Sequence, residues 1–469
     1  CRRRSVCAIS EECILPKRNM ERVDGKFMLK IAFCDDDLEI LKELGILLDK
    51  YKKERDEDLT YTVFQSPLEL LAAIEKGFSF DISFLDILMP GENGIETAKE
   101  IRQYDNNMMN IVKVILPEKC RIICVSDIHA HYDEFARLLR KCDYNNESDY
   151  LFILGDILEK GRQNIETLHF IQELSRGEKC VCIKGNNDTM VSRMAFDDEK
   201  EKFLERLTYR PVNAYMQMAE SIGITDLTTD FDNKRNAVNQ KFAKELSFVS
   251  GLPTAIETEK HIFVHAGIEN RTDWENSLEQ FVLCAPWWIR SGHFPTYNFA
   301  RGKNTNLPII DTDKRIIAVD GGCSVKSAGQ INAFIITKDG ESYSYDNVFE
   351  PSEPCEKCTV IKDYTAARHY SYLDYEKSDL EILGKSDGLV SVRDKHSGNS
   401  GLIFERFIAE WGDGRFHGWT NLDAFVCVNK GETFCVYYKN EKYCYGIAQS
   451  GEVGMIPTDC VAVFKEKYV

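Results

Sequence analysis

The chain has 469 residues and a formal net charge of −17, with 43% hydrophobic and 29% charged residues. This length predicts about three domains of ordinary size, and the composition is that of a globular protein with ample core. The negative charge argues against nucleic acid or an anionic membrane as a partner, because both are bound through clustered Lys and Arg side chains.

Seventeen cysteines are spread along the chain, and several of them lie in apolar, strand-like runs, such as Cys34, Cys124 and Cys182. Cysteines in such runs are typical of buried thiols in a reducing compartment. No apolar run reaches the roughly 18 to 20 residues of a membrane span, and the first residues do not resemble a signal peptide. We therefore expect a cytoplasmic protein without a membrane partner.

The N-terminal part of the chain predicts a tail followed by a small α/β unit. Residues 1–27 lack periodicity and are expected to be unstructured, with Met28 as the natural start of the ordered chain. Three strand and helix pairs then alternate over residues 28–108, and this alternation predicts a parallel sheet. The first strand ends in CDDD, and the third strand and its loop read FLDILMPGENGIE.

These two acidic motifs resemble the receiver domain of two-component response regulators, which has a flavodoxin-like fold. The resemblance implies that Asp86 is the phosphoacceptor and that Asp35 and Asp36 hold Mg²⁺. The fourth-strand Ser or Thr and the fifth-strand Lys of that family have no counterpart before the next motif begins at Arg121. We therefore expect a partial receiver unit whose switch is vestigial.

A second set of polar motifs follows a series of apolar runs between residues 109 and 348. The stretch RIICVSDIHAH ends in Asp127 and His129, and DYLFILGDILEKG ends in Gly155 and Asp156. Three further runs end in GNND, in HAGI and in the SGHF stretch. Because ligand sites of open α/β sheets lie at the carboxyl ends of strands, we expect these motifs to converge.

A pair of divalent cations needs a shared carboxylate and a mixed set of oxygen and nitrogen ligands, and the motifs supply one. Asp156 is the expected bridge. Glycines before Asp156, Asn186 and His293 allow the backbone to turn tightly beside the ligands. The expected metals are Mn²⁺ or, as alternatives, iron or zinc. The complete predicted ligand set is Asp127, His129, Asp156, Asn186, His265 and His293.

The order and contexts of these motifs resemble the calcineurin-like metallophosphoesterases, in particular the branch with serine/threonine protein phosphatases and bacterial diadenosine tetraphosphate hydrolases. The resemblance implies an α/β sandwich that hydrolyses a phosphorylated protein or a small phosphoester. The stretch IIAVDGGCSVKSAGQINAFII is expected to form two paired closing strands, and residues 190–250 a helical cap beside the metals.

The chain departs from the protein phosphatase pattern at two motifs. That branch has Asp-Arg-Gly where this chain has Glu159, Lys160 and Gly161, and it has a histidine where this chain has Asn187. Asn187 cannot act as an acid at neutral pH, although it can donate a hydrogen bond to developing charge. We predict Asn187, Asp156 and Lys160 or Arg162 as the catalytic side chains, with Lys160 or Arg162 binding the phosphate.

Residues 349–469 consist of short apolar runs separated by polar turns, which predicts a small β-barrel. The final stretch, ETFCVYYKNEKYCYGIAQSGEVGMIPTDCV, resembles the last strands of a Src-homology-3-like domain. The resemblance implies a module that binds a peptide partner or the cell wall, and a purely structural appendage is the alternative. Cys355 and Cys358 have no second pair at zinc spacing, so we expect free thiols.

Two other functions remain open on the sequence alone. One is a phosphorylation-responsive signalling protein dominated by the receiver unit, and the other is a catalytically weak metal-binding scaffold. The missing receiver lysine argues against the first, and the six predicted ligands argue against the second. We therefore expect a metal-dependent phosphoesterase.

Overall fold

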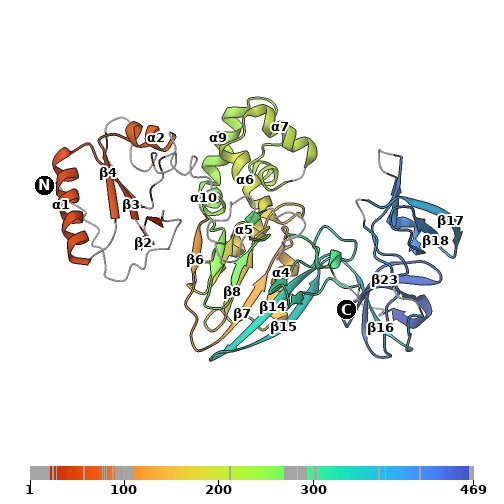
Figure 1. Cartoon of the computed structure of the whole chain (residues 1–469). Coiled ribbons are helices and arrows are strands. Elements are labelled where there is room, and N and C mark those ends of the chain that lie inside the picture. Colours follow the sequence, from red (N-terminus) through yellow and green to blue (C-terminus); the bar gives the residue numbers. More distant parts are fainter. Residues whose placement is uncertain are drawn as a thin grey trace. The chain divides into compact units, whose positions relative to one another are not determined.

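The computed structural model divides into two compact units, with the boundary between Met109 and Asn110 (Figure 1). No helix among the described residues combines the length and the apolar character needed to cross a lipid bilayer. The structure describes residues 22–23, 26–27, 29–55, 59–75, 78, 80, 82–86, 89, 97, 109–210, 213–268, 282–283, 293–299, 304–367, 370–374, 377–410 and 414–463.

The first unit contains a three-stranded parallel sheet, as its sequence predicts. The sheet has the order β4-β3-β5, and Cys34 on the central strand is buried. A β-branched and aromatic strand composition favours this sheet. The elements are β3 (Leu29–Cys34), α1 (Leu38–Arg55), β4 (Leu59–Phe64), α2 (Pro67–Glu75) and β5 (Ile82–Leu85). The MPGENG loop lies, apart from Met89, outside the described residues.

The prediction of an unstructured tail over residues 1–27 is wrong at its C-terminal end. Two short strands, β1 (Arg22–Val23) and β2 (Lys26–Phe27), pair antiparallel there. The sequence between them is Asp-Gly, which is one of the dipeptides that favour a two-residue hairpin loop. The other residues of the predicted tail, and Met28, lie outside the described part of the chain.

The second unit begins with an α/β sandwich built on a five-stranded sheet of order β15-β14-β7-β8-β9. Strands β7, β8 and β9 are parallel to one another, whereas β14 is antiparallel to both β7 and β15. The strands are β7 (Lys119–Val125), β8 (Tyr150–Leu154), β9 (Cys180–Ile183), β14 (Gln330–Asp339) and β15 (Ser342–Pro351).

Alternate residues of the central strands enter two different cores, because successive strand side chains point to opposite faces. On β7, Ile123 and Val125 pack against the helices, and Ile122 and Cys124 join the core on the other face. That other face is covered by a small sheet of order β11-β10-β6. Its strands are β6 (Ile111–Lys113), β10 (Ala255–Glu257) and β11 (Ile262–Val264).

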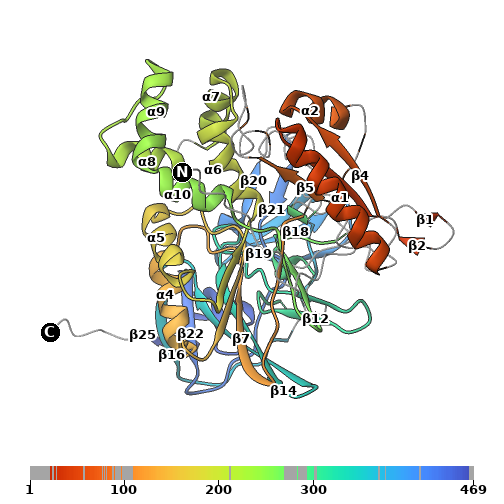
Figure 2. The ribbon, with the colours of Figure 1, turned by 90° about the vertical axis from the view of Figure 1, so that its left-hand side faces the viewer.

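The helices of this domain form two groups (Figures 1 and 2). Helices α4 (Tyr132–Lys141) and α5 (Asn164–Leu174) follow β7 and β8 and contribute to the first core. The predicted helical cap is present beyond the carboxyl ends of these strands. It consists of α6 (Asn186–Phe196), α7 (Lys200–Tyr209), α8 (Ala214–Ser221), α9 (Phe231–Lys241) and α10 (Ala243–Ser250).

The prediction that the two closing strands pair with each other is wrong. Strand β13 (Ile316–Ala318) pairs with β12 (Ile309–Asp311), and β14 instead pairs with β7 and β15. The reason is burial: β14 carries the apolar run Ala333–Ile336, and its position between β7 and β15 buries nearly the whole strand.

The C-terminal part of the second unit is rich in β-strands and contains a repeated order of elements that the prediction of one small barrel did not anticipate. Each repeat has three antiparallel strands, a short 3₁₀-helix and a last strand. The first comprises β17 (Leu380–Ser386), β18 (Leu389–Asp394), β19 (Ser400–Phe404), η3 (Glu405–Phe407) and β20 (Ile408–Glu410). The second comprises β22 (Thr433–Lys439), β23 (Tyr443–Ala448), β24 (Val453–Pro457), η4 (Thr458–Cys460) and β25 (Val461–Val463).

Each repeat pairs with a leading strand from elsewhere. Strand β16 (Glu356–Val360) precedes the first repeat but pairs with β22 and β25 of the second. Strand β21 (Phe416–Gly418) precedes the second repeat but pairs with β20 of the first. This exchange ties the two repeats together, since neither completes its strand pairing alone.

Candidate metal centre

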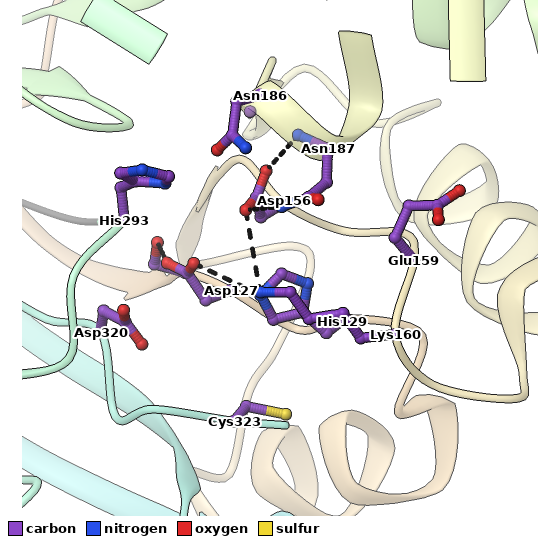
Figure 3. A network of polar contacts seen from close by, with 12 residues as sticks. Asp127, His129, Asp156, Glu159, Lys160, Asn186, Asn187, His293, Asp320 and Cys323 are labelled. Atoms are coloured by element: carbon purple, nitrogen blue, oxygen red, sulfur yellow. Dashed lines mark hydrogen bonds and ion pairs between the residues drawn. The ribbon is translucent and has the colours of Figure 1, made fainter. Parts of the chain in front are cut away.

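Asp127, His129 and Asp156 lie in loops that leave the carboxyl ends of strands (Figure 3). His293 lies instead shortly before the 3₁₀-helix η2 (Thr296–Asn298), and no described strand ends directly before it. Asp127 and His129 follow β7, and Asp156 follows β8. Asn186 begins α6 directly after β9, and His265 follows β11. Parallel strands end at a common edge, which brings side chains from distant parts of the sequence within a few ångströms.

The first group of candidate ligands consists of Asp127, His129 and Asp156, all of which are buried. His129 Nε2 lies 3.6 Å from Asp127 Oδ1 and 3.8 Å from Asp156 Oδ2. The other ring nitrogen, Nδ1, lies 3.3 Å from the Leu158 carbonyl oxygen. A hydrogen bond to that carbonyl leaves Nε2 as the nitrogen available to a cation.

The second group consists of Asp156, His265 and His293. His265 Nε2 lies 3.5 Å from Asp156 Oδ1, 3.3 Å from His293 Nδ1 and 3.1 Å from Asn186 Oδ1. His265 Nδ1 lies 2.8 Å from the Leu154 carbonyl oxygen, so His265, like His129, uses Nδ1 for a backbone carbonyl and leaves Nε2 for a cation. Asp156 belongs to both groups and presents a different carboxylate oxygen to each histidine.

Backbone conformation turns these side chains toward one another. Asp127, His129 and Asp156 have φ angles of 54°, 48° and 52°, a left-handed region that Asp and His tolerate better than most residues. Gly155 and Gly185 permit the close approach of the two loops. A Cβ on Gly155 would lie 2.7 Å from Gly185 N, and one on Gly185 would lie 2.2 Å from Asp156 Oδ1.

Burial and mutual contact determine the protonation of the cluster. Burial, with Asp320 nearby, raises the pKa of Asp127 well above its usual range. Burial also favours the neutral form of Asp156, but His265 outweighs it and holds the Asp156 pKa well below its usual value. Although burial opposes it, the Asp156 carboxylate raises the pKa of His265 to about 10. A cation bound here would therefore displace the His265 proton.

The predicted catalytic side chains differ in their placement. Lys160 Nζ lies 2.9 Å from His129 Nε2, and burial followed by this lysine lowers the His129 pKa to about 3. Asn187 donates hydrogen bonds to Asp156 from its backbone N–H, at 2.8 Å, and from its side-chain Nδ2. Arg162 is exposed, and no hydrogen bond or ion pair joins it to a described residue, so its predicted role stays a prediction.

Three residues near this centre were not predicted from the sequence. Asp320 is buried beside Asp127, and its Oδ1 accepts a hydrogen bond of 2.7 Å from Gly322 N. Asp188 accepts hydrogen bonds from Ile157 N and Gly185 N, which fastens the loop of Asp156 to the start of α6. Arg210 Nη1 donates to Asn187 Oδ1 from the residue that follows α7.

The donor set fits a pair of divalent cations. Each group offers three ligand atoms that lie within 4.8 Å of one another, and one carboxylate is common to both groups. Carboxylate, amide and imidazole donors suit Mn²⁺, iron and zinc alike, so the geometry does not select among them. The predicted ligands are thus brought together, and their roles in binding remain predictions.

Residues 120–317 match the family model described as Calcineurin-like phosphoesterase. The chain contains a calcineurin-like metallophosphoesterase domain. Members of this family bind divalent metals, in accord with the two groups of candidate ligands.

Curated relatives of this phosphoesterase domain carry the name "Bis(5'-nucleosyl)-tetraphosphatase, symmetrical". The protein of Buchnera aphidicola subsp. Acyrthosiphon pisum (strain Tuc7) is 31% identical over 90 residues, which are 19% of this chain and 32% of the relative. That of Vibrio parahaemolyticus serotype O3:K6 is 24% identical over 155 residues, which are 33% of this chain and 47% of the relative. The chain thus spans about a third to a half of the length of these relatives.

Among solved structures, a protein serine/threonine phosphatase from Saccharomyces cerevisiae aligns with a TM-score of 0.33 and 11% sequence identity. The alignment covers 67% of this chain and 97% of that chain.

A separate acidic cluster lies in the first unit. Asp35, Asp36 and Asp86 bring one carboxylate oxygen each within 4.8 Å of the others. Burial, and after it the nearby Asp86 and Asp36 carboxylates, raise the pKa of Asp35. The three residues predicted for a receiver-type site are thus adjacent, and their function there is untested.

Proposed function

We propose that this protein is a metal-dependent phosphoesterase. The observation that carries the proposal is the position of Asp156, whose two carboxylate oxygens face two different groups of candidate ligands. Its location in a calcineurin-like phosphoesterase domain supports the same conclusion.

In this proposal, Asp127, His129 and Asp156 hold one cation, and Asp156, Asn186, His265 and His293 hold the second. A bound pair of divalent cations supplies a water of lowered pKa and neutralises the charge of a phosphate. Lys160, which lies beside His129, provides a mobile positive charge for a phosphate oxygen. Arg162, two residues further along the chain, is the alternative for this role.

The substrate that the site suits best is a phosphoanhydride. Asn187 stands where the protein phosphatase pattern has a histidine, and an amide cannot protonate a leaving oxygen. A nucleoside diphosphate leaves as a much weaker base than a serine alkoxide, so it needs protonation less. The names of the curated relatives support a dinucleoside tetraphosphate, which water would split into two nucleoside diphosphates. A phosphorylated protein is the alternative substrate.

The test is a hydrolysis panel with added Mn²⁺, Fe²⁺ or Zn²⁺. Diadenosine tetraphosphate, p-nitrophenyl phosphate, bis-p-nitrophenyl phosphate and a phosphoserine peptide would be compared at equal concentration. We expect turnover of the tetraphosphate to exceed that of the peptide, with Mn²⁺ the most effective metal. Asp156→Asn should abolish turnover, whereas Asp313→Asn, a change at an exposed turn, should not.

Two outcomes would contradict the proposal. A folded protein that binds Mn²⁺ but hydrolyses none of these substrates would be a metal-binding scaffold. Preferential hydrolysis of the phosphoserine peptide would assign the domain to the protein phosphatase branch and would show that another group supplies the proton.

We further propose that residues 28–108 derive from a response-regulator receiver, with Mg²⁺ at Asp35 and Asp36 and a vestigial phosphoacceptor at Asp86. The adjacency of these three carboxylates supports this assignment. The two C-terminal repeats, each with a 3₁₀-helix before the last strand, support a Src-homology-3-like assignment and a peptide partner. A cytoplasmic location remains the expectation from the cysteine content.

A further inference from the structure

Arg210 contacts the side chain that replaces the missing histidine. Arg210 Nη1 donates to Asn187 Oδ1, and Asn187 Nδ2 donates to Asp156 Oδ2. A guanidinium has only donors, so the amide oxygen of Asn187 must face Arg210, and the Asn187 NH₂ group is left to donate to Asp156. The Asn187 NH₂ group therefore faces the metal centre.

The guanidinium of Arg210 is itself held by a buried carboxylate. Arg210 Nη1 lies 3.9 Å from Glu159 Oε2, an oxygen that is buried and accepts no hydrogen bond from any described residue. Glu159 Oε1 accepts a hydrogen bond of 3.0 Å from Ala214 N at the start of α8. Figure 3 shows the Glu159 side chain directed away from Asp156, toward the cap. Glu159 thus interacts with Arg210 and with the backbone of the cap rather than with the candidate metal ligands.

The backbone at Arg210 is anchored as well. Asn213 Nδ2 donates a hydrogen bond of 2.8 Å to the Arg210 carbonyl oxygen, and Asn213 Oδ1 accepts one of 2.8 Å from Met216 N. Asn213 is buried, and it caps α8 through the second of these bonds. The cap therefore delivers a fixed positive charge to Asn187, while the Arg210 side chain remains 36% exposed.

We propose that Arg210 is a positioning residue for hydrolysis, and this proposal rests on the proposed phosphoesterase function. Arg210 orients the Asn187 amide and polarises it, so that an Asn187 N–H stabilises the charge that develops on the leaving oxygen. A donor polarised by a neighbouring cation forms a stronger hydrogen bond to an anion than an isolated amide does. Such donors act where charge develops in the transition state.

The chemical step balances without an acid at this position. The water oxygen forms a bond to phosphorus, and the bond from phosphorus to the leaving oxygen breaks with its electron pair on that oxygen. The proton lost by water passes to solvent. Asn187 keeps both of its amide protons and only donates a hydrogen bond.

The experiment measures kcat and KM for a series of aryl phosphates of increasing leaving-group pKa, in Arg210→Met, Arg210→Lys, Asn187→Ala and the double variant. We expect Arg210→Met to lower kcat roughly 10²-fold for the poorest leaving groups and much less for the best ones. Arg210→Lys should restore part of the loss, and methylguanidinium should rescue Arg210→Met. In the Asn187→Ala background, Arg210→Met should cause little further loss.

Controls separate this role from a structural one. Arg176→Met, at an exposed arginine that forms an ion pair with Glu173, should leave kcat unchanged. Thermal unfolding and Mn²⁺ binding by calorimetry should be alike in Arg210→Met and the unmodified protein. A loss of kcat equal for all leaving groups, or additive with Asn187→Ala, would overturn the proposal while leaving the phosphoesterase function intact. An unmodified protein that hydrolyses neither the aryl phosphates nor diadenosine tetraphosphate would instead overturn the function on which the proposal rests.

Discussion

Glu159 offers a test of the electrostatics around the metal centre that does not depend on activity. This carboxyl is fully buried, and burial raises its pKa from 4.5 to about 7 even though Ala214 N and Arg210 oppose the shift. Because the folded pKa lies above the unfolded one, the charged form of Glu159 destabilises the fold. The penalty is absent below pH 4.5, grows as the pH rises, and is complete above pH 7.

The size of the penalty follows from the two pKa values. A difference of about 2.5 pKa units corresponds to about 3 kcal/mol at 1.36 kcal/mol per unit. Glu159→Gln keeps an oxygen that can accept the Ala214 N–H bond but never acquires the charge. We therefore expect Glu159→Gln to leave the free energy of unfolding nearly unchanged at pH 4.5 and to raise it by about 3 kcal/mol at pH 8.

Urea unfolding at pH 4.5 and pH 8, with a chelator present throughout, would measure this difference. Glu166→Gln, at an exposed glutamate on α5, is the matched control and should show no pH-dependent change. An equal effect of Glu159→Gln at both pH values would refute the reasoning. It would mean that Arg210 compensates the buried charge in full.

Three further predictions concern the two acidic clusters. Chelation should abolish hydrolysis and added Mn²⁺ should restore it, and activity that survives exhaustive chelation would contradict this. Asp156→Asn should lower kcat by more than the roughly 10- to 100-fold loss typical of residues that only contact a metal ligand, because both groups of candidate ligands share this carboxylate. Lys160→Met should lower kcat and should strengthen Mn²⁺ binding, measured by calorimetry, by roughly tenfold, because Lys160 Nζ lies at the His129 nitrogen that a cation would use. An unchanged affinity for Mn²⁺ would show that the lysine does not compete with the cation. Acetyl phosphate should phosphorylate Asp86 weakly or not at all, as measured by mass spectrometry, because the fifth-strand lysine of receiver domains has no counterpart in this chain. A stable aspartyl phosphate at Asp86 that alters the rate of hydrolysis would contradict this prediction.

Part of the fold and of the metal centre follows from local sequence. Apolar runs that end in Asp127 and Asp156 predict strands whose carboxyl ends carry ligands, and parallel strands necessarily end at one edge. For that reason the sequence alone indicates the candidate ligands, although not the distances between them. The C-terminal repeats also left a local signal that a self-comparison would have found, because SGNSGLIFERFIAE and SGEVGMIPTDCVAV share their glycines and apolar positions.

Tertiary structure alone decided the features that depend on contacts between distant segments. Strand β14 pairs with β7, more than 200 residues earlier in the chain, and nothing in the local pattern of β14 selects that neighbour over β13. The sequence likewise does not determine that β16 pairs with the second repeat and β21 with the first, because both repeats offer sheet edges of similar composition. An arginine after a helix indicates only a favourable interaction with the helix dipole. Arg210 contacts Asn187 because folding brings the end of α7 next to the start of α6. The sequence around Arg210 does not predict that contact.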